Sequence, residues 1–139
     1  MAIFLNNKAG FKIASIDLSA FVSSITINRV LEQLDVTAMG DSSRKFTGGL
    51  RADSITVSLF SDTATASVLQ TLQDAFGTTV AVSMIQVKGD PVSATNKTYA
   101  TTVLVDSLND INGGVGDMAT LDLTFTCNSP IEPSSSVAF

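Results

Sequence analysis

Apolar and polar residues alternate with period two over most of this chain, and this pattern predicts a protein built mainly from β-strands. In SITVSLF, at 54–60, Ile55, Val57 and Leu59 lie on one face and hydroxyl residues on the other. The same alternation at 118–128 sets four apolar residues against threonines and an aspartate: Leu121, Leu123, Phe125 and Cys127. Further strands are predicted at 3–5, 11–16, 21–28, 34–39, 79–88 and 98–108.

One segment has the period of a helix instead. Its apolar residues fall on a single helical face, at Val68, Leu69, Leu72, Ala75 and Phe76. Asp62 precedes the stripe as a candidate N-cap, and Gly77 follows it in the usual position of a helix stop. We therefore predict one helix over Thr63–Phe76 whose stripe covers one face of the folded sheets.

The strands at 34–39 and 54–60 are separated by the polar stretch GDSSRKFTGG at 40–49. A tight hairpin turn needs only about 2–5 residues, and longer connections in compact domains often serve a function. We expect an arm, about 28–52, that reaches a partner; a mobile surface loop is the alternative. The residues expected to make the contact are Gly40, Asp41, Arg44, Lys45, Phe46, Gly48 and Gly49.

The composition describes one sparsely charged domain spanning 1–139. Charged residues make up 15% of the chain, below the usual level of about 25%. A surface with so little charge suits a protein covered by other subunits, although a sparsely charged monomer is the alternative. The last segment, about 129–139, contains two prolines and a run of three serines, and is predicted to be an extended tail.

Charge is distributed unevenly along the chain. Residues 1–97 hold eight basic and eight acidic residues, and residues 98–139 hold five acidic and no basic residues, so the net charge of -5 comes from the last third. This pattern lacks the basic stripe of a nucleic-acid-binding protein. No stretch approaches the about 20 apolar residues of a membrane span, and the opening residues do not form a signal peptide. We expect synthesis in a cytoplasm and no membrane partner.

The residues needed for common catalytic and metal sites are missing. The chain has no histidine, and its single cysteine, Cys127, excludes an internal disulfide and is expected to be a buried structural residue. The sequence at 110–113 lacks the alternating oxygen ligands of an EF-hand and is interpreted as a turn. Nothing in the pattern supports hydrolysis by paired carboxylates, so we expect no enzyme, no cofactor and no metal.

The order of features resembles the tail tube proteins of long, non-contractile tailed bacteriophages. The resemblance rests on DLSAFVSSITI at 17–27, LEQLDVTAMGDSSRKFTGGL at 31–50, the following strand and helix, and GGVGDMATLDLTF at 113–125. It implies a two-sheet β-sandwich or open barrel with one flanking helix and a long extended arm. It also implies hexameric rings that stack into a hollow tube for DNA ejection, with the arm and the terminal segments between rings.

The resemblance further implies a virion-tail location and other tail proteins as partners, such as terminator, distal tail and tape-measure proteins. DNA would pass through the tube without specific binding. Other virion components remain open at this stage, including a tail terminator or a decoration protein, as does a secretion-system tube protein. An adhesion or carbohydrate-binding β-sandwich is a further alternative, but Tyr99 and scattered phenylalanines offer few aromatic side chains for sugar binding.

A tube that passes DNA should have a neutral or acidic wall, because each Lys or Arg contact with phosphate adds attraction. The polar face of the strand at 118–128 offers such a surface. We hypothesise that the lumen is lined by Asp106, Thr120, Asp122, Thr124 and Thr126, with Thr98 and Thr102 on the preceding strand offering the matching face. Ordinary solvated aspartates on an outer wall are the alternative.

Overall fold

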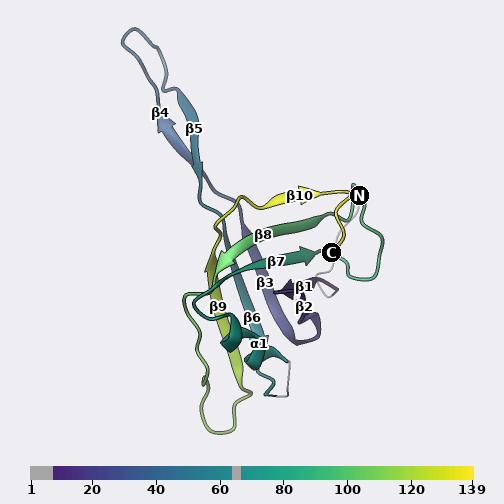
Figure 1. The fold of residues 1–139 in the computed structure, drawn as a ribbon. Helices are drawn as coiled ribbons and strands as arrows, with labels where there is room; N and C mark the ends of the chain where they lie inside the picture. The colour runs from purple at the N-terminus through teal and green to yellow at the C-terminus, as the bar shows by residue number, and fades with distance from the viewer. Residues whose placement is uncertain (1–7, 64–66) are drawn as a thin grey trace.

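The computed structural model describes residues 8–63 and 67–139, and antiparallel strands dominate it (Figure 1). The strands form two larger sheets that share one core and a separate two-stranded ribbon. The mainly β architecture with a single helix, predicted from the sequence, is confirmed.

The larger sheet has the order β10-β8-β7-β1-β2. Its strands are β1 (Gly10–Ile13), β2 (Ile16–Asp17), β7 (Thr79–Ile85), β8 (Thr98–Leu104) and β10 (Glu132–Ser134). The single strand predicted at 11–16 is wrong, because a turn at Ala14 and Ser15 divides it. Both turn residues have positive φ, 51° and 67°, as a tight two-residue hairpin turn requires. Neither is the Asn or Gly that usually marks such a turn, so the sequence did not reveal it.

The second sheet has the order β3-β6-β9 and packs against the first. Its strands are β3 (Val22–Asn28), which follows the short 3-10 helix η1 (Ser19–Phe21), β6 (Ser54–Phe60) and β9 (Thr120–Thr126). The alternation predicted for the last two is confirmed, since their inward side chains are fully buried: Ile55, Val57, Leu59, Leu121, Leu123 and Phe125. Four predicted strands have shorter ends in the structure than in the sequence pattern: 21–28, 79–88, 98–108 and 118–128.

The helix α1 (Val68–Ala75) connects β6 to β7 and contributes Val68 and Leu72 to the same core. It is shorter than predicted: Ser67 is its N-cap residue and donates a hydrogen bond to Asp62, while residues 64–66 lie outside the described part. The prediction for Phe76 is wrong. This residue lies beyond the last helical turn and is 53% exposed, because the helix ends before its ring could reach the core. Gly77 follows with φ +81°, which confirms the predicted stop.

The ribbon consists of β4 (Leu31–Asp35) and β5 (Phe46–Arg51), which form a hairpin projecting from the body of the protein (Figure 1). The strand predicted at 34–39 is therefore displaced, and Phe46, Gly48 and Gly49 belong to a strand and not to the connection. Side chains on both faces of this ribbon are largely exposed. Because neither face of the ribbon is buried, the alternation of apolar and polar residues does not mark where its strands begin and end. The strand ends predicted from the sequence were therefore misplaced.

The segment 129–139 is extended, but it does not project as an arm. Ile131 is fully buried, and β10 pairs with β8 at the edge of the larger sheet. The Thr98 hydroxyl donates a 2.7 Å hydrogen bond to the Val137 carbonyl, and the Lys12 ammonium lies 4.8 Å from the centre of the Phe139 ring. The tail is thus packed on the body. The strand predicted at 3–5 lies outside the described residues.

Candidate assembly surfaces

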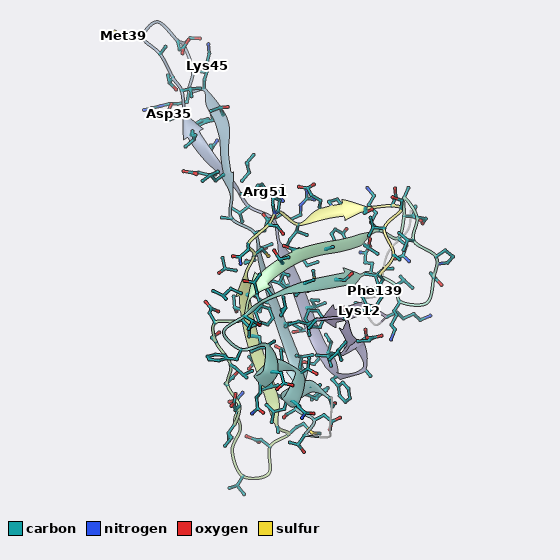
Figure 2. The ribbon with its side chains drawn as sticks, viewed as in Figure 1. Lys12, Asp35, Met39, Lys45, Arg51 and Phe139 are labelled. Atoms are coloured by element: carbon teal, nitrogen blue, oxygen red, sulfur yellow. The ribbon has the colours of Figure 1, made fainter. Side chains whose placement is uncertain are left out.

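A buried ion pair holds the base of the hairpin. The Asp53 carboxylate accepts two hydrogen bonds from the Arg51 guanidinium, one from Nη2 at 2.6 Å and one from Nε at 3.2 Å. Its carboxylate also accepts the backbone N–H of Val30 at 3.0 Å and that of Ile131 at 2.7 Å. Arg51 in turn donates to Glu132 at 2.9 Å. The base therefore ties the hairpin to the body and to the C-terminal segment (Figure 2).

The charges at this base are stabilised by their partners. Burial alone raises the pKa of Asp53, but hydrogen bonds from Ile131, Arg51 and Val30 outweigh it, and the pKa falls below its usual value. Hydrogen bonds to Asp53 and Glu132 raise the pKa of Arg51. Asp53 was not predicted as a site residue, because an Asp between two strands is typical of an ordinary turn.

The hairpin tip, residues 36–45, is held by solvent-exposed polar contacts. Arg44 pairs with Asp35 at 2.8 Å and Lys45 with Asp41 at 2.9 Å. Asp41 also accepts the N–H of Ala38 at 2.8 Å. The adjoining Gly40 has φ +93°, a conformation that side chains disfavour, so glycine suits this turn. These contacts give the tip a defined shape.

Along the ribbon, small and large residues are matched across the two strands. A Cβ atom at Gly48 would lie 3.0 Å from the Leu31 side chain, and one at Gly49 would lie 3.0 Å from the Glu32 carboxylate. The two glycines thus let these side chains lie across β5. The residues predicted to form an arm therefore belong to one hairpin: four in the tip and three in β5. Several of its apolar side chains are exposed, among them Met39 at the extreme end (Figure 2).

The outer side of the β3-β6-β9 sheet is covered mainly by hydroxyl side chains, with Phe60 at one end and Asn28 at the other, and we name it the hydroxyl face. Paired residues across the three strands place its members together: Ser24, Thr26, Thr56, Ser58, Thr120, Asp122, Thr124 and Thr126. Asp122 accepts a 2.8 Å hydrogen bond from Ser58. None of the three strands contains Lys or Arg. Four of the residues predicted to line a lumen are therefore on one face.

The structure does not bring the remaining predicted lumen residues to this face. Strand β8 belongs to the other sheet, so its side chains cannot continue the pattern of β9. Thr98 is buried beneath the C-terminal segment, and the Thr102 hydroxyl donates to Ser129 at 3.2 Å. Asp106 is exposed beyond the end of β8. The matching face predicted for Thr98, Thr102 and Asp106 was wrong, because consecutive strands here lie in different sheets.

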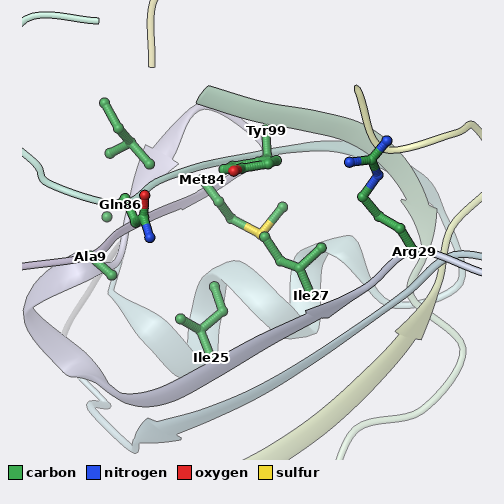
Figure 3. A pocket seen from close by; sticks show the side chains of 9 residues that line it. Ala9, Ile25, Ile27, Arg29, Met84, Gln86 and Tyr99 are labelled. Atoms are coloured by element: carbon green, nitrogen blue, oxygen red, sulfur yellow. The ribbon is translucent and has the colours of Figure 1, made fainter. Parts of the chain in front are cut away.

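The β3-β6-β9 sheet has two edges that the described residues leave open, since β3 and β9 pair along their length only with β6. Beside β3 lies a cleft of about 310 Å³ between the two sheets (Figure 3). Its walls include Ile25 and Ile27 from β3 and Met84 and Tyr99 from the other sheet. The two isoleucines are only partly buried, so this edge of the core is incompletely covered.

A second projecting segment connects β8 to β9, and we name residues 106–118 the distal loop. Ile111, Val115 and Met118 are highly exposed there. Hydrogen bonds from Gln73 to Asp110 at 3.3 Å and from the Gly114 N–H to Asp117 at 3.1 Å shape the loop. From the sequence, only a turn at 110–113 was predicted in this stretch. Three large apolar residues among its glycines were the available sign of a contact surface.

The described residues contain no cluster of three or more His, Cys, Asp or Glu side chains that could hold a metal ion. Cys127 is half-buried, and burial raises the pKa of its thiol, a change that disfavours the reactive thiolate. In the same residues no helix is long and apolar enough to cross a membrane.

Comparison with solved structures identifies the fold. The chain superimposes on a component of the virion of a native gene transfer agent with a TM-score of 0.76 and 15% identity, over 95% of this chain and 99% of that one. The SPP1 tail tube matches with a TM-score of 0.73 and 13% identity, over 93% of this chain and 78% of that one. The tail of an empty gene transfer agent particle with C6 symmetry matches with a TM-score of 0.68 and 14% identity, over 93% of this chain and 96% of that one.

No protein-family model matches the sequence, and no curated relative was found by sequence. At such low identities the likeness establishes the fold. The protein has the tail-tube fold over almost its whole length, as the resemblance noted in the sequence implied.

Proposed function

We propose that this protein is the building unit of a virion tail tube, a stack of hexameric rings through which DNA passes into the host. The observation that carries the proposal is the likeness of nearly the entire chain to tail components, including a tail with C6 symmetry. The proposed role is structural and non-enzymatic. The tube would meet a terminator, a distal tail protein and a tape-measure protein at its ends and in its lumen, and would be assembled in the host cytoplasm.

The open edges of the β3-β6-β9 sheet support ring formation. Both edge strands are seven residues long, and each exposes unpaired backbone groups that favour pairing with another strand. In a head-to-tail contact, β9 of one copy would lie beside β3 of the next. Such a contact closes into a ring when the rotation between copies allows it. The incompletely covered cleft beside β3 would then be shielded by the neighbouring copy.

Closing these sheets into one barrel would turn the hydroxyl face toward the lumen. This face has hydroxyl groups, the single carboxylate of Asp122 and the ring of Phe60 at one end, so it offers phosphate no cation to bind. Around a ring, Asp122 becomes a circle of negative charge that repels DNA from the wall. We therefore retain Thr120, Asp122, Thr124 and Thr126 as lumen-facing residues in this proposal.

Negative-stain electron microscopy of the purified protein tests the proposal directly. We expect hollow tubes with sixfold end views. Single rings would indicate a terminator-like component, and a monodisperse monomer at all concentrations would contradict a tube-forming role.

The lumenal position has its own test in Asp122→Lys. This variant should assemble normally and slow DNA ejection, most strongly at low salt, where phosphate attraction is least screened. Asp74→Lys, on an exposed helical position, makes the same charge change away from the proposed lumen and should leave ejection unchanged. Equal ejection kinetics for both variants in low salt would place Asp122 outside the lumen.

A further inference from the structure

The hairpin tip and the distal loop lie at opposite ends of the molecule (Figure 1). The strand register requires this arrangement, because Ser54 pairs with Thr126 at one end of β6 and Phe60 with Thr120 at the other. The hairpin joins the body just before Ser54, at the start of β6. The distal loop joins it just before Thr120, at the start of β9. Any chain of copies joined end to end along this direction would bring one segment against the other.

Both segments expose apolar side chains that the body does not cover. At the hairpin these include Val36, Met39 and Phe46, and in the distal loop they include Ile111 and Val115. Side chains of this size gathered on projecting segments mark contact sites more often than scattered surface residues do. The distal loop contacts the helix through Gln73 and Asp110, yet Ile111 and Val115 stay almost fully exposed, as does Met39 at the end of the hairpin.

The two ends differ in charge. Arg44 and Lys45 are the last charged residues of the tip before β5, and their side chains are 74% and 61% exposed. The distal loop contains Asp106, Asp110 and Asp117, and the chain has no cation after Lys97. With Asp41 included, the tip has a net charge of +1 and the distal loop a net charge of -3, so two loops repel each other whereas a tip and a loop attract. The charges therefore favour a head-to-tail contact between copies over a symmetric one.

The existing ion pairs of the tip leave capacity for such a contact. Arg44 uses one of its five N–H donors on Asp35, and Lys45 places its ammonium, with three donors, on Asp41. Pairs this exposed contribute little to folding and can share their cations with a second carboxylate. The tip can thus meet an acidic partner without unfolding.

We propose that the hairpin tip of one copy docks on the distal loop of the next copy along the tube. Met39 and Phe46 pack against Ile111 and Val115, and Arg44 and Lys45 face the loop carboxylates. This inference rests on the proposed tube-forming function and adds the receiving surface for the hairpin, for which the sequence offered no candidate.

Charge reversal tests the contact, with tube formation followed by sedimentation and electron microscopy. The tip variant is Arg44→Glu with Lys45→Glu, and the loop variant is Asp110→Lys with Asp117→Lys. Each should stay folded by circular dichroism and raise the critical concentration for tube growth by about tenfold or more, since like charges then face each other. An equimolar mixture of the two variants should recover tubes, because each acidic tip then meets a basic loop and each basic tip an acidic loop.

Two further variants keep the test decisive. Asp117 supports the turn at Gly114 and Asp110 accepts from Gln73, so Asp106→Lys alone changes the loop charge while keeping both hydrogen bonds. Asp74→Lys with Asp90→Lys changes the net charge as much as the loop variant does, at exposed sites elsewhere, and should assemble normally. If the wild type forms tubes and the tip and loop variants form them equally well, this contact is overturned. It is also overturned if the mixture of the two variants recovers no tubes. A wild-type protein that never polymerises would instead contradict the tube function.

Discussion

The base and the tip of the hairpin use the same kind of ion pair in opposite surroundings. At the base, Arg51 and Asp53 lie 2.6 Å apart with side chains 23% and 1% exposed. At the tip, Arg44 and Asp35 lie 2.8 Å apart with side chains 74% and 44% exposed. The distances are nearly equal, so distance does not separate the two pairs. Burial does, because water screens the tip pair and is excluded from the carboxylate at the base.

This difference assigns the two pairs to different tasks. The base pair satisfies backbone groups of Val30 and Ile131, so it belongs to the fold. The tip pair lies among exposed residues, so its charges can also reach a neighbouring copy. Changes at the base should alter folding stability, and changes at the tip should alter assembly. The following predictions run from the largest expected effect on folding stability to the smallest.

Asp53→Ala should lower the free energy of unfolding by about 2 kcal/mol or more, since each buried polar group left without a partner costs about 1–3 kcal/mol. The substitution leaves Arg51 without its main partner and the N–H groups of Val30 and Ile131 without an acceptor. Urea denaturation monitored by circular dichroism measures the loss, with Asp35→Ala as the matched control. A loss below about 1 kcal/mol, the range of ordinary surface substitutions, would mean that the base is not an anchor.

Acid should destabilise the protein through carboxylates whose pKa is lowered in the folded state. At Asp17 burial raises the pKa, but hydrogen bonds from Lys88 and Ser19 outweigh this effect and bring it from 3.8 to about 2. The unfolded chain therefore binds protons more readily, and the contribution of Asp17 is present above about pH 4 and lost as the pH falls toward 2. Asp53 is shifted in the same direction.

The pH effect sharpens the comparison between base and tip when stability is measured from pH 6 to pH 2. Asp53→Asn removes the titrating group from the base and should flatten the curve more than Asp35→Asn at the tip. Equal flattening by both substitutions would show that burial does not distinguish the two sites.

Replacing residues 36–45 by Asn-Gly should leave folding stability within about 1 kcal/mol of the wild type. The two-residue turn can join Asp35 directly to Phe46, which already pair across the ribbon. The shortened protein should remain a folded, soluble monomer or ring and form no tubes. A ten-residue Gly/Ser loop keeps the original length of the tip without its side chains, so it separates the effect of length from the effect of the contact residues. Normal tubes from the shortened protein would remove the tip from the assembly contact.

The smallest effect on folding is expected at the tip pair. Arg44→Ala, Asp35→Ala and the double variant should have urea midpoints indistinguishable from the wild type, because exposed ion pairs contribute little to stability. A double-mutant cycle in urea measures the coupling between the two residues. A clear coupling would show that the tip contributes to the fold and would remove the contrast with the base.

Much of the architecture follows from local pattern. The strands β6 and β9 and the stop of α1 at Gly77 were predictable, because period-two burial and a positive φ after a helix are properties of neighbouring residues. The hydroxyl face on β9 was predictable for the same reason. The resemblance in the sequence also pointed to the tail-tube fold that the structural comparison then established.

What the sequence by itself determined was which residues of β6, β9 and α1 up to Ala75 face the core, and where the helix stops. Only the tertiary structure decided which edges, sheets and distant segments meet. It placed β8 and β9 in different sheets, folded the C-terminal segment onto β8, and buried Asp53 where Ile131 could donate to it. The physical reason is that the alternation of apolar and polar residues depends only on neighbouring positions in one strand. Strand partners and buried charges instead depend on residues far apart in the chain, as between Asp53 and Ile131, and no local pattern records those contacts.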